Sequence, residues 1–180
     1  LGLSLGDITS GYNLIIKPHM WTYYLDSFGG ISLKGQRNLI FKLIDQFDHI
    51  RLLTPAEYNV TPYYKISDLL LTDASSTIYE MIALSKPVVV NRFYHLKLSH
   101  RIFQKRLYKR RLDKEMNDEV EKFCFLADNI KQVPLAIEKA LNQNNKNKVL
   151  IKEYQKKMLY KLDGSASIRA RDEILKRMNR

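Results

Sequence analysis

The sequence predicts a fold of the α/β class, with a Rossmann-like parallel sheet in which strands and helices alternate. Three short apolar runs, residues 12–16, 50–53 and 69–71, are too short for helices and suit strands that are buried on both faces. Residues 36–47 lie between the first two runs and carry apolar side chains at helical spacing. This alternation is typical of a doubly wound sheet with right-handed crossovers, so we expect ligands at the carboxyl ends of the strands.

The size and composition of the chain suit one domain with a substantial core. The chain has 180 residues, 45% of them hydrophobic, and we expect a single domain over residues 1–180. Leu1 is not a methionine and opens within an apolar pattern, so we expect a fragment of a longer protein. No apolar run approaches the length of a membrane span, and no signal peptide is visible. The single cysteine, Cys124, excludes an internal disulfide and is expected in the core.

The charge of the chain points to anionic partners. The net charge is +11, which suits a nucleotide, a phosphate polymer, an acidic lipid surface or a nucleic acid. Residues 92–114 hold nine basic residues and one acid, a net +8, together with an apolar stripe. We expect a basic amphipathic helix there that binds an anionic membrane surface or a polyphosphate chain, the alternative being a solvated face. No nucleic-acid motif accompanies the charge, so we expect no nucleic-acid partner.

Two basic side chains follow the first expected strand. Lys17, Pro18 and His19 come directly after residues 12–16, which puts His19 on the ligand side of a parallel sheet. The alternative is a turn histidine whose ring bonds to the backbone. Residues 21–30 are aromatic and then glycine-rich, and we expect a loop there.

The stretch of residues 67–87 is the centre of the predicted site. Thr72 and Asp73 stand at the end of its strand, and Ser75 and Ser76 come before apolar residues at helical spacing. Such a loop brings an acid and two hydroxyls to the carboxyl edge of the sheet. With the free backbone N–H groups of a helix start, the hydroxyls suit a phosphate or pyrophosphate. The alternative is ordinary helix capping by serine and aspartate.

The remaining pattern continues the alternation of strands and helices. Residues 88–90 and 123–126 predict two further short strands. Apolar spacing predicts helices around residues 133–141, 150–158 and 170–178.

A second polar element, D-G-S-A-S-I-R at residues 163–169, precedes the last helix. Its glycine permits a turn with positive φ, and either Ser165 or Ser167 can cap the helix. Arg169 would lie in the first turn, where a cation is unfavourable with the helix dipole. We therefore expect a paired anion, either the carboxylate of Asp163 or a bound phosphate.

Three motifs are spread over nearly the whole chain. They are K-P-H at residues 17–19, T-D-A-S-S at residues 72–76 with a helix and K-P after it, and D-G-S-A-S-I-R at residues 163–169. Their order and spacing resemble the CDP-glycerol glycerophosphotransferase family, the teichoic-acid primases and polymerases. Two positions depart from that family's pattern. Met20 stands where proline is usual, and Ala74 stands where an aromatic residue is common.

The resemblance implies the C-terminal, donor-binding half of a GT-B architecture, in which two Rossmann-like domains face each other. The family transfers glycerol phosphate, or a related polyol phosphate, from a CDP-linked donor to a growing anionic surface polymer. It does so at the cytoplasmic face of the bacterial membrane, as a peripheral protein, and we expect neither a cofactor nor a metal. A general base is expected from an N-terminal domain, so we expect these 180 residues to bind nucleotide without turnover.

The resemblance also implies roles for single residues. Ser75 and Ser76 would hold the donor phosphates, and Asp73 would orient donor hydroxyls. His19 would act near the reacting phosphate as a proton donor or charge stabiliser. Arg169 would stabilise the charge on the departing CMP. The further expected substrate-binding residues are Lys17, Thr72, Glu80, Asp163 and Ser167.

Two other functions are open at this point. One is a nucleotide-sugar glycosyltransferase or epimerase of the same architecture, although no Gly-rich loop precedes Ser75. The other is a non-catalytic domain that docks on anionic lipid through residues 92–114.

Overall fold

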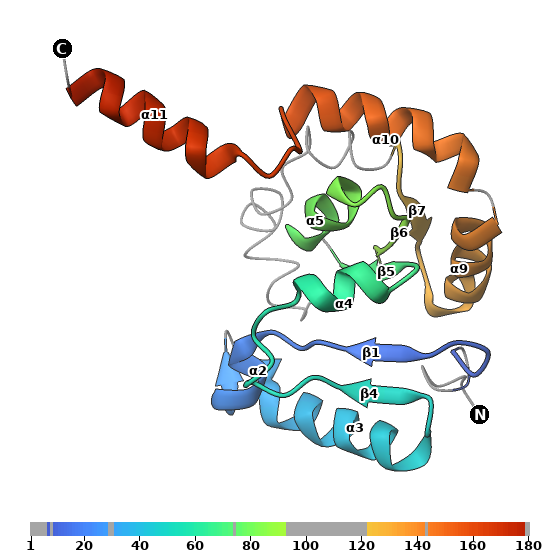
Figure 1. Ribbon diagram of the computed structural model, residues 1–180. Helices are drawn as coiled ribbons and strands as arrows, with labels where there is room; N and C mark the ends of the chain where they lie inside the picture. The colour runs from blue at the N-terminus through green and yellow to red at the C-terminus, as the bar shows by residue number, and fades with distance from the viewer. Residues whose placement is uncertain are drawn as a thin grey trace, which may run out of the picture. The chain divides into compact units, whose positions relative to one another are not determined.

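In the residues that the structure describes, the protein is a mixed α/β chain with two small parallel sheets (Figure 1) and one antiparallel pair of two-residue strands. The structure, a computed structural model, describes residues 7, 9–28, 31–73, 75–92, 122–142 and 144–178. The chain divides into two compact units, Leu1–Pro62 and Tyr63–Arg180, which are described separately. The predicted α/β class is confirmed, whereas the single domain over residues 1–180 and the GT-B architecture stay predictions.

The first unit is built on two parallel strands. Strand β1 (Leu14–Ile16) pairs with β4 (Ile50–Leu52), and helix α3 (Leu33–Gln46) joins and covers them. The strands and the helix confirm the predictions for residues 12–16, 50–53 and 36–47. The helix begins earlier than its apolar spacing indicates, because Ser32 Oγ accepts from the backbone N of Gly35 at 3.0 Å.

The prediction of a loop over residues 21–30 is wrong. Helix α2 (Met20–Tyr24) and the antiparallel strands β2 (Ser27–Phe28) and β3 (Ile31–Ser32) occupy its described part. The physical reason is Arg37 of α3. Its Nη1 donates to the carbonyls of Thr22 and Leu25 at 2.8 Å and of Tyr23 at 3.2 Å, and its Nη2 pairs with Asp26 at 2.7 Å. A distant guanidinium therefore satisfies the C-terminal carbonyls that a five-residue helix leaves open.

The second unit is built on a three-stranded parallel sheet in the order β5-β6-β7. Each strand matches a predicted apolar run, and α5 is the crossover from β5 to β6. The strands are β5 (Leu70–Thr72), β6 (Val88–Asn91) and β7 (Phe125–Ala127). The helical elements are α4 (Thr61–Ile66), which crosses the unit boundary, α5 (Thr77–Ala83), η1 (Ile130–Gln132), α9 (Val133–Asn142), α10 (Asn144–Met158) and α11 (Ala166–Met178).

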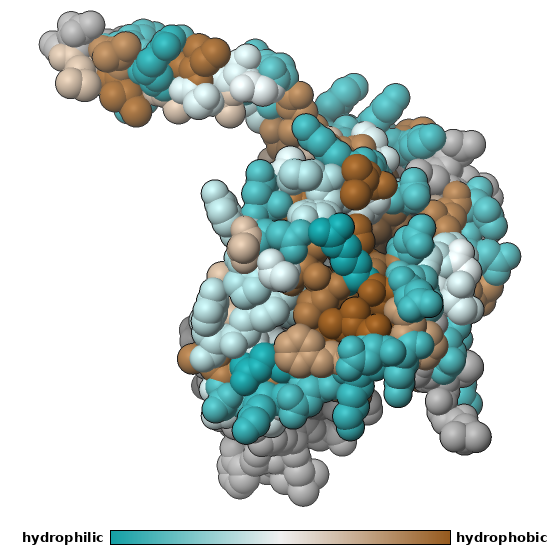
Figure 2. All heavy atoms as spheres, turned by 60° about the horizontal axis from the view of Figure 1, so that its bottom comes forward, coloured by the Kyte–Doolittle hydropathy of each residue, from teal (hydrophilic) through white to brown (hydrophobic). Residues whose placement is uncertain are grey.

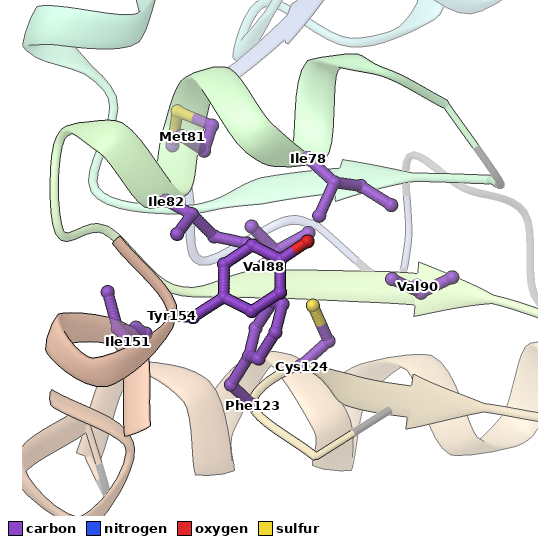
Figure 3. Close-up of a cluster of buried hydrophobic side chains, with 9 residues drawn as sticks. All are labelled: Ile78, Met81, Ile82, Val88, Val90, Phe123, Cys124, Ile151 and Tyr154. Carbon is purple, nitrogen blue, oxygen red and sulfur yellow. The ribbon is translucent and has the colours of Figure 1, made fainter. Parts of the chain in front are cut away.

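One hydrophobic cluster in the core of the second unit lies on one face of β6. Figure 3 shows the nine-residue cluster, in which Tyr154 and Phe123 pack over the strand that carries Val88 and Val90. The ring centroids of Phe123 and Tyr154 are 4.6 Å apart. The members of this cluster are Ile78, Met81, Ile82, Val88, Val90, Phe123, Cys124, Ile151 and Tyr154.

The other face of β6 is covered by α9, because successive strand residues point to opposite faces. Val89, between the two core valines, is fully buried, and α9 packs against β6 and β7. Cys124 is buried as expected, and burial raises the pKa of its thiol to about 12. A thiol with this pKa stays protonated at neutral pH, so Cys124 is a packing residue.

The predictions for the basic segment fall mostly outside the described residues. Of residues 92–114 the structure describes only Arg92, so the amphipathic helix stays a prediction. Across the described part of the chain, no helix combines the length and apolar content that a membrane crossing needs.

Candidate functional site

The three parallel strands of the second unit end at one edge of their sheet. Thr72 pairs with Val90, and Asn91 pairs with Ala127, so the carboxyl ends of β5, β6 and β7 are level to within one residue. Polar residues follow each strand end, beginning with Asp73 after β5. This is the edge at which open α/β sheets bind ligands.

The two serines of the loop after β5 have different roles. Ser75 Oγ accepts from Thr77 Oγ1 at 3.1 Å and from Thr77 N at 3.4 Å, so Ser75 supplies the capping that was the alternative interpretation. Ser76 occupies the N-cap position of α5 with helical dihedrals and makes no side-chain cap bond. Its side chain is exposed. Capping thus accounts for Ser75 and leaves the hydroxyl of Ser76 uncommitted.

The two predicted acidic residues of this region lie in different places. Asp73 is exposed, directly beyond the end of β5, beside the half-buried Thr72. Glu80 lies one turn into α5 and is also exposed. Burial, and second to it the charge of Glu80, raise the pKa of Tyr64. The carboxylate of Glu80 is therefore near α4, whereas that of Asp73 is at the sheet edge.

Lys86, the lysine of the K-P pair after α5, holds the start of this region, a role that the sequence analysis did not predict. Lys86 Nζ donates to the carbonyls of Tyr64 at 2.9 Å and Ser67 at 2.6 Å, and also to that of Lys65. An ammonium at the C-terminus of a helix is favoured by the helix dipole as well as by these bonds. Lys86 thereby fixes where the chain leaves α4 and enters β5.

The other end of α5 is held by α10. Gln155 Nε2 donates to the carbonyl of Ile82 at 2.6 Å and to Ser85 Oγ at 3.0 Å. Ser85 has a φ of 57°, the left-handed conformation that commonly ends a helix. The sequence predicts neither role, because Lys86 and Gln155 donate to groups that are distant along the chain.

The element at residues 163–169 is closed on itself by an ion pair. Arg169 Nη1 donates to Asp163 Oδ1 at 2.8 Å and to Oδ2 at 2.9 Å, and its guanidinium carbon lies 5.7 Å from the centroid of the Tyr160 ring. Asp163 Oδ1 also accepts from Ser165 N at 3.0 Å. Of the two anions expected for Arg169, the structure contains the carboxylate.

This ion pair shapes the start of α11. Two hydrogen bonds lower the pKa of Asp163, and the one from Arg169 has a larger effect than the one from Ser165 N. The helix begins at Ala166, four residues before the predicted start, and Ser165 O accepts from Arg169 N at 3.1 Å. Ser167 is exposed in the first turn. Of the two expected capping serines, Ser165 is therefore the one that precedes the helix.

No residue of α11 is buried in the described structure. Figure 2 shows apolar and hydrophilic side chains side by side on this helix, at the upper left of the view. Its exposed apolar residues are Ile168, Ile174, Leu175 and Met178.

The histidine motif lies in the first unit, where His19 begins α2. His19 Nδ1 accepts from Trp21 N at 3.2 Å, and the two rings meet edge to face with centroids 4.8 Å apart. The backbone-bonded histidine given as the alternative is therefore present. A neutral imidazole that accepts at Nδ1 carries its proton on Nε2, so the exposed edge of His19 is a donor. Lys17 Nζ donates to the carbonyl of Pro18 at 3.2 Å.

Eight of the ten predicted site residues fall into three local groups, each described within its own unit. One loop holds Thr72, Asp73, Ser75 and Ser76, one ion pair holds Asp163 and Arg169, and the first unit holds Lys17 and His19. Among the residues that the structure describes, no hydrogen bond or ion pair joins the loop to the ion pair. Their convergence on one donor stays a prediction.

Within the described ranges, no group of three or more His, Cys, Asp and Glu side chains could hold a metal ion.

Comparisons with protein-family models, curated proteins and solved structures found no significant match to this chain.

Proposed function

We propose that this chain is the donor-binding part of a glycerophosphotransferase. It would bind a CDP-linked polyol phosphate, such as CDP-glycerol, for transfer to an anionic surface polymer of the teichoic-acid type. The fold would be the C-terminal, Rossmann-like half of a GT-B architecture. The observation that supports this most is the carboxyl edge of the β5-β6-β7 sheet, where an exposed Asp73 and an uncommitted Ser76 follow β5.

In this proposal the phosphates of the donor lie at the loop of residues 75–76. The Ser76 hydroxyl donates to a phosphate oxygen and has no cap bond to α5 to break first. Lys86 and Gln155 hold α5 and the entry to β5 from outside the loop, so the loop is preorganised for binding.

His19 and Arg169 are the proposed catalytic residues. The Nε2 proton of His19 would be donated to the leaving phosphate or would stabilise its charge. Arg169 uses Nη1 for Asp163, and the carboxylate holds the guanidinium in a fixed orientation over Tyr160. The remaining N–H groups of Arg169 would then face the charge that develops on CMP.

The test is titration calorimetry of the chain with CDP-glycerol, CDP-ribitol and UDP-N-acetylglucosamine. We expect the CDP-linked polyols to bind, and Ser76→Ala to weaken binding about tenfold, the loss of one hydrogen bond to a charged group. Arg169→Ala should weaken binding by at least as much. The exposed Ser10, in the first unit, supplies a matched control in Ser10→Ala, which should bind as the unaltered chain does.

Each alternative function has a distinct outcome in this experiment. Binding of UDP-N-acetylglucosamine in preference to both CDP compounds would favour a nucleotide-sugar glycosyltransferase or epimerase. Binding of none of the three would contradict the donor-binding proposal. Detectable polymerisation by these 180 residues alone would contradict the need for a second domain.

The proposal also includes peripheral membrane association through residues 92–114. Vesicles containing phosphatidylglycerol should bind the chain at low salt and release it as salt screens the charges. Binding that persists when the lysines and arginines of residues 97–111 are replaced by glutamine would count against this segment.

A further inference from the structure

The middle strand of the second sheet ends on a polar atom with no partner. Oδ1 of Asn91 is buried and accepts no hydrogen bond from any residue that the structure describes. Asn91 is the last residue of β6, which has β5 on one side and β7 on the other. A buried carbonyl oxygen left without a donor destabilises a fold, so it needs an explanation.

The register of the sheet places a second acceptor next to Asn91. Thr72 pairs with Val90, so Asp73, one residue further along, comes level with Asn91. Val90 points into the core cluster, and alternation turns Asn91 to the opposite face. Asp73, the residue directly beyond the end of β5, is therefore the neighbour of Asn91 at the carboxyl edge of the sheet.

The chemistry of this pair selects its ligand. A carboxylate and an amide carbonyl are both acceptors, so they disfavour phosphate oxygens and favour groups that carry O–H or N–H. Two acceptors at the ends of adjacent strands, whose backbones lie about 4.8 Å apart in a sheet, suit two neighbouring hydroxyls. On the far side of Asn91 the partner in the ladder is Ala127, which offers no polar side chain.

We propose that Asn91 and Asp73 bind a vicinal diol of the donor, either that of the ribose or that of the polyol, next to the phosphates at Ser76. Asn91 is then a specificity-determining residue. This inference rests on the proposed donor-binding function and adds the residue that reads the neutral part of the donor.

The Asn91 amide can reach such a ligand by a small motion. The residue is half-buried, so one side of it meets solvent while the carbonyl oxygen does not. Rotation about the terminal torsion of asparagine is soft, and a half-turn exchanges the amide oxygen and nitrogen. The neighbouring cation does not compete for the oxygen, because the guanidinium of Arg92 pairs with Asp128 at 2.6 Å.

The test uses Asn91→Leu, which removes the unpaired acceptor at similar volume. We expect this variant to melt at a higher temperature than the unaltered chain and to bind CDP-glycerol about tenfold more weakly. If Asn91 had a purely structural role, Asn91→Leu would instead lower the melting temperature. Asn142→Leu, at an exposed position at the end of α9, should change neither quantity.

Two ligand pairs distinguish the sources of the diol. CMP against 2′,3′-dideoxy-CMP reports on the ribose, and glycerol 3-phosphate against propyl phosphate reports on the polyol. In the pair that carries the diol bound by Asn91, Asn91→Leu should weaken binding of the compound with hydroxyls about tenfold. It should leave binding of the analogue without those hydroxyls unchanged.

The outcomes separate this inference from the function on which it rests. If the unaltered chain binds CDP-glycerol and Asn91→Leu binds it equally well, the diol site is refuted and the donor-binding function stands. An effect of Asn91→Leu that is the same with and without the diols also refutes the site. If the unaltered chain binds none of these ligands, both proposals fail together.

Discussion

The two units of the chain are stabilised in different ways. In its described residues the first unit buries the apolar side chains of Leu33, Ile50 and Leu53, and it joins α2 to α3 through the hydrogen bonds of Arg37. The second unit instead buries a contiguous nine-residue cluster between its sheet and α5 and α10. The comparison teaches that one unit depends on a polar contact for its shape and the other on packing.

Two intrinsic probes report on the units separately. The only tryptophan, Trp21, lies in α2 of the first unit, and the only cysteine, Cys124, lies in the core of the second. Fluorescence of Trp21 therefore follows the first unit, and alkylation of the thiol of Cys124 follows opening of the second.

The largest expected effect is in the core of the second unit. Ile82→Ala removes a fully buried side chain and should lower the free energy of unfolding by about 3 kcal/mol. Denaturant unfolding followed by Cys124 alkylation measures it. Leu135→Ala, at an exposed position of α9, should change it by less than about 0.5 kcal/mol.

The second largest effect is expected when the polar contact of the first unit, made by Arg37, is removed. Arg37→Met keeps the aliphatic stem but removes the donors to three carbonyls, and should cost about 2 kcal/mol in the Trp21 transition. Arg51→Met is the matched control, because Arg51 also has an acidic partner, Glu57, but is 67% exposed, against 20% for Arg37. The control should cost less than about 1 kcal/mol.

These two experiments together decide whether the comparison is correct. If Ile82→Ala moves the Trp21 transition as much as the Cys124 transition, the units unfold as one and their separate stabilisation is wrong.

A smaller effect distinguishes the two serines of the candidate site. Ser75→Ala removes the acceptor for Thr77 and should destabilise the second unit by about 1 kcal/mol. Ser76→Ala removes a hydroxyl without a cap bond and should leave stability within about 0.5 kcal/mol. Equal losses of stability in the two variants would show that Ser76 is also a cap and is not available to a ligand.

The smallest effect is a pH dependence at the start of α11. Arg169 holds the pKa of Asp163 below its ordinary value. The ionised carboxylate therefore stabilises the folded state at every pH above the ordinary pKa of an aspartate. This contribution is lost as the pH falls through the lowered pKa. NMR titration of the Asp163 carboxyl should show the depressed pKa, and Arg169→Gln should return it towards its ordinary value. An unchanged titration in Arg169→Gln would contradict the ion pair.

Local patterns predicted the regular elements well where the core decides them. The strands near residues 14, 50, 70 and 88 and helix α3 follow from apolar runs and helical spacing, because burial of those side chains selects the element. The short helix α2 could not be predicted in this way. Its carbonyls are satisfied by Arg37, which lies 12 to 15 residues beyond them in the chain.

The candidate site was predictable in part. Asp73, Ser75 and Ser76 were found because capping residues after an apolar run mark the carboxyl end of a strand. The roles of Lys86, Gln155 and Asn91 were not predicted. The partners of the first two are carbonyls, which leave no trace in the sequence, and the third matters only because of the register of β5 against β6.

By itself the sequence determined the α/β class, the buried cysteine, the basic charge and the polar loops that follow the strands, because each depends on composition or on neighbours along the chain. Only the tertiary structure decided which serine is a cap, which anion pairs with Arg169, and which buried oxygen of β6 has no donor. Each of these outcomes depends on which donor and acceptor atoms come within about 3 Å of each other, and the folded backbone alone sets those distances.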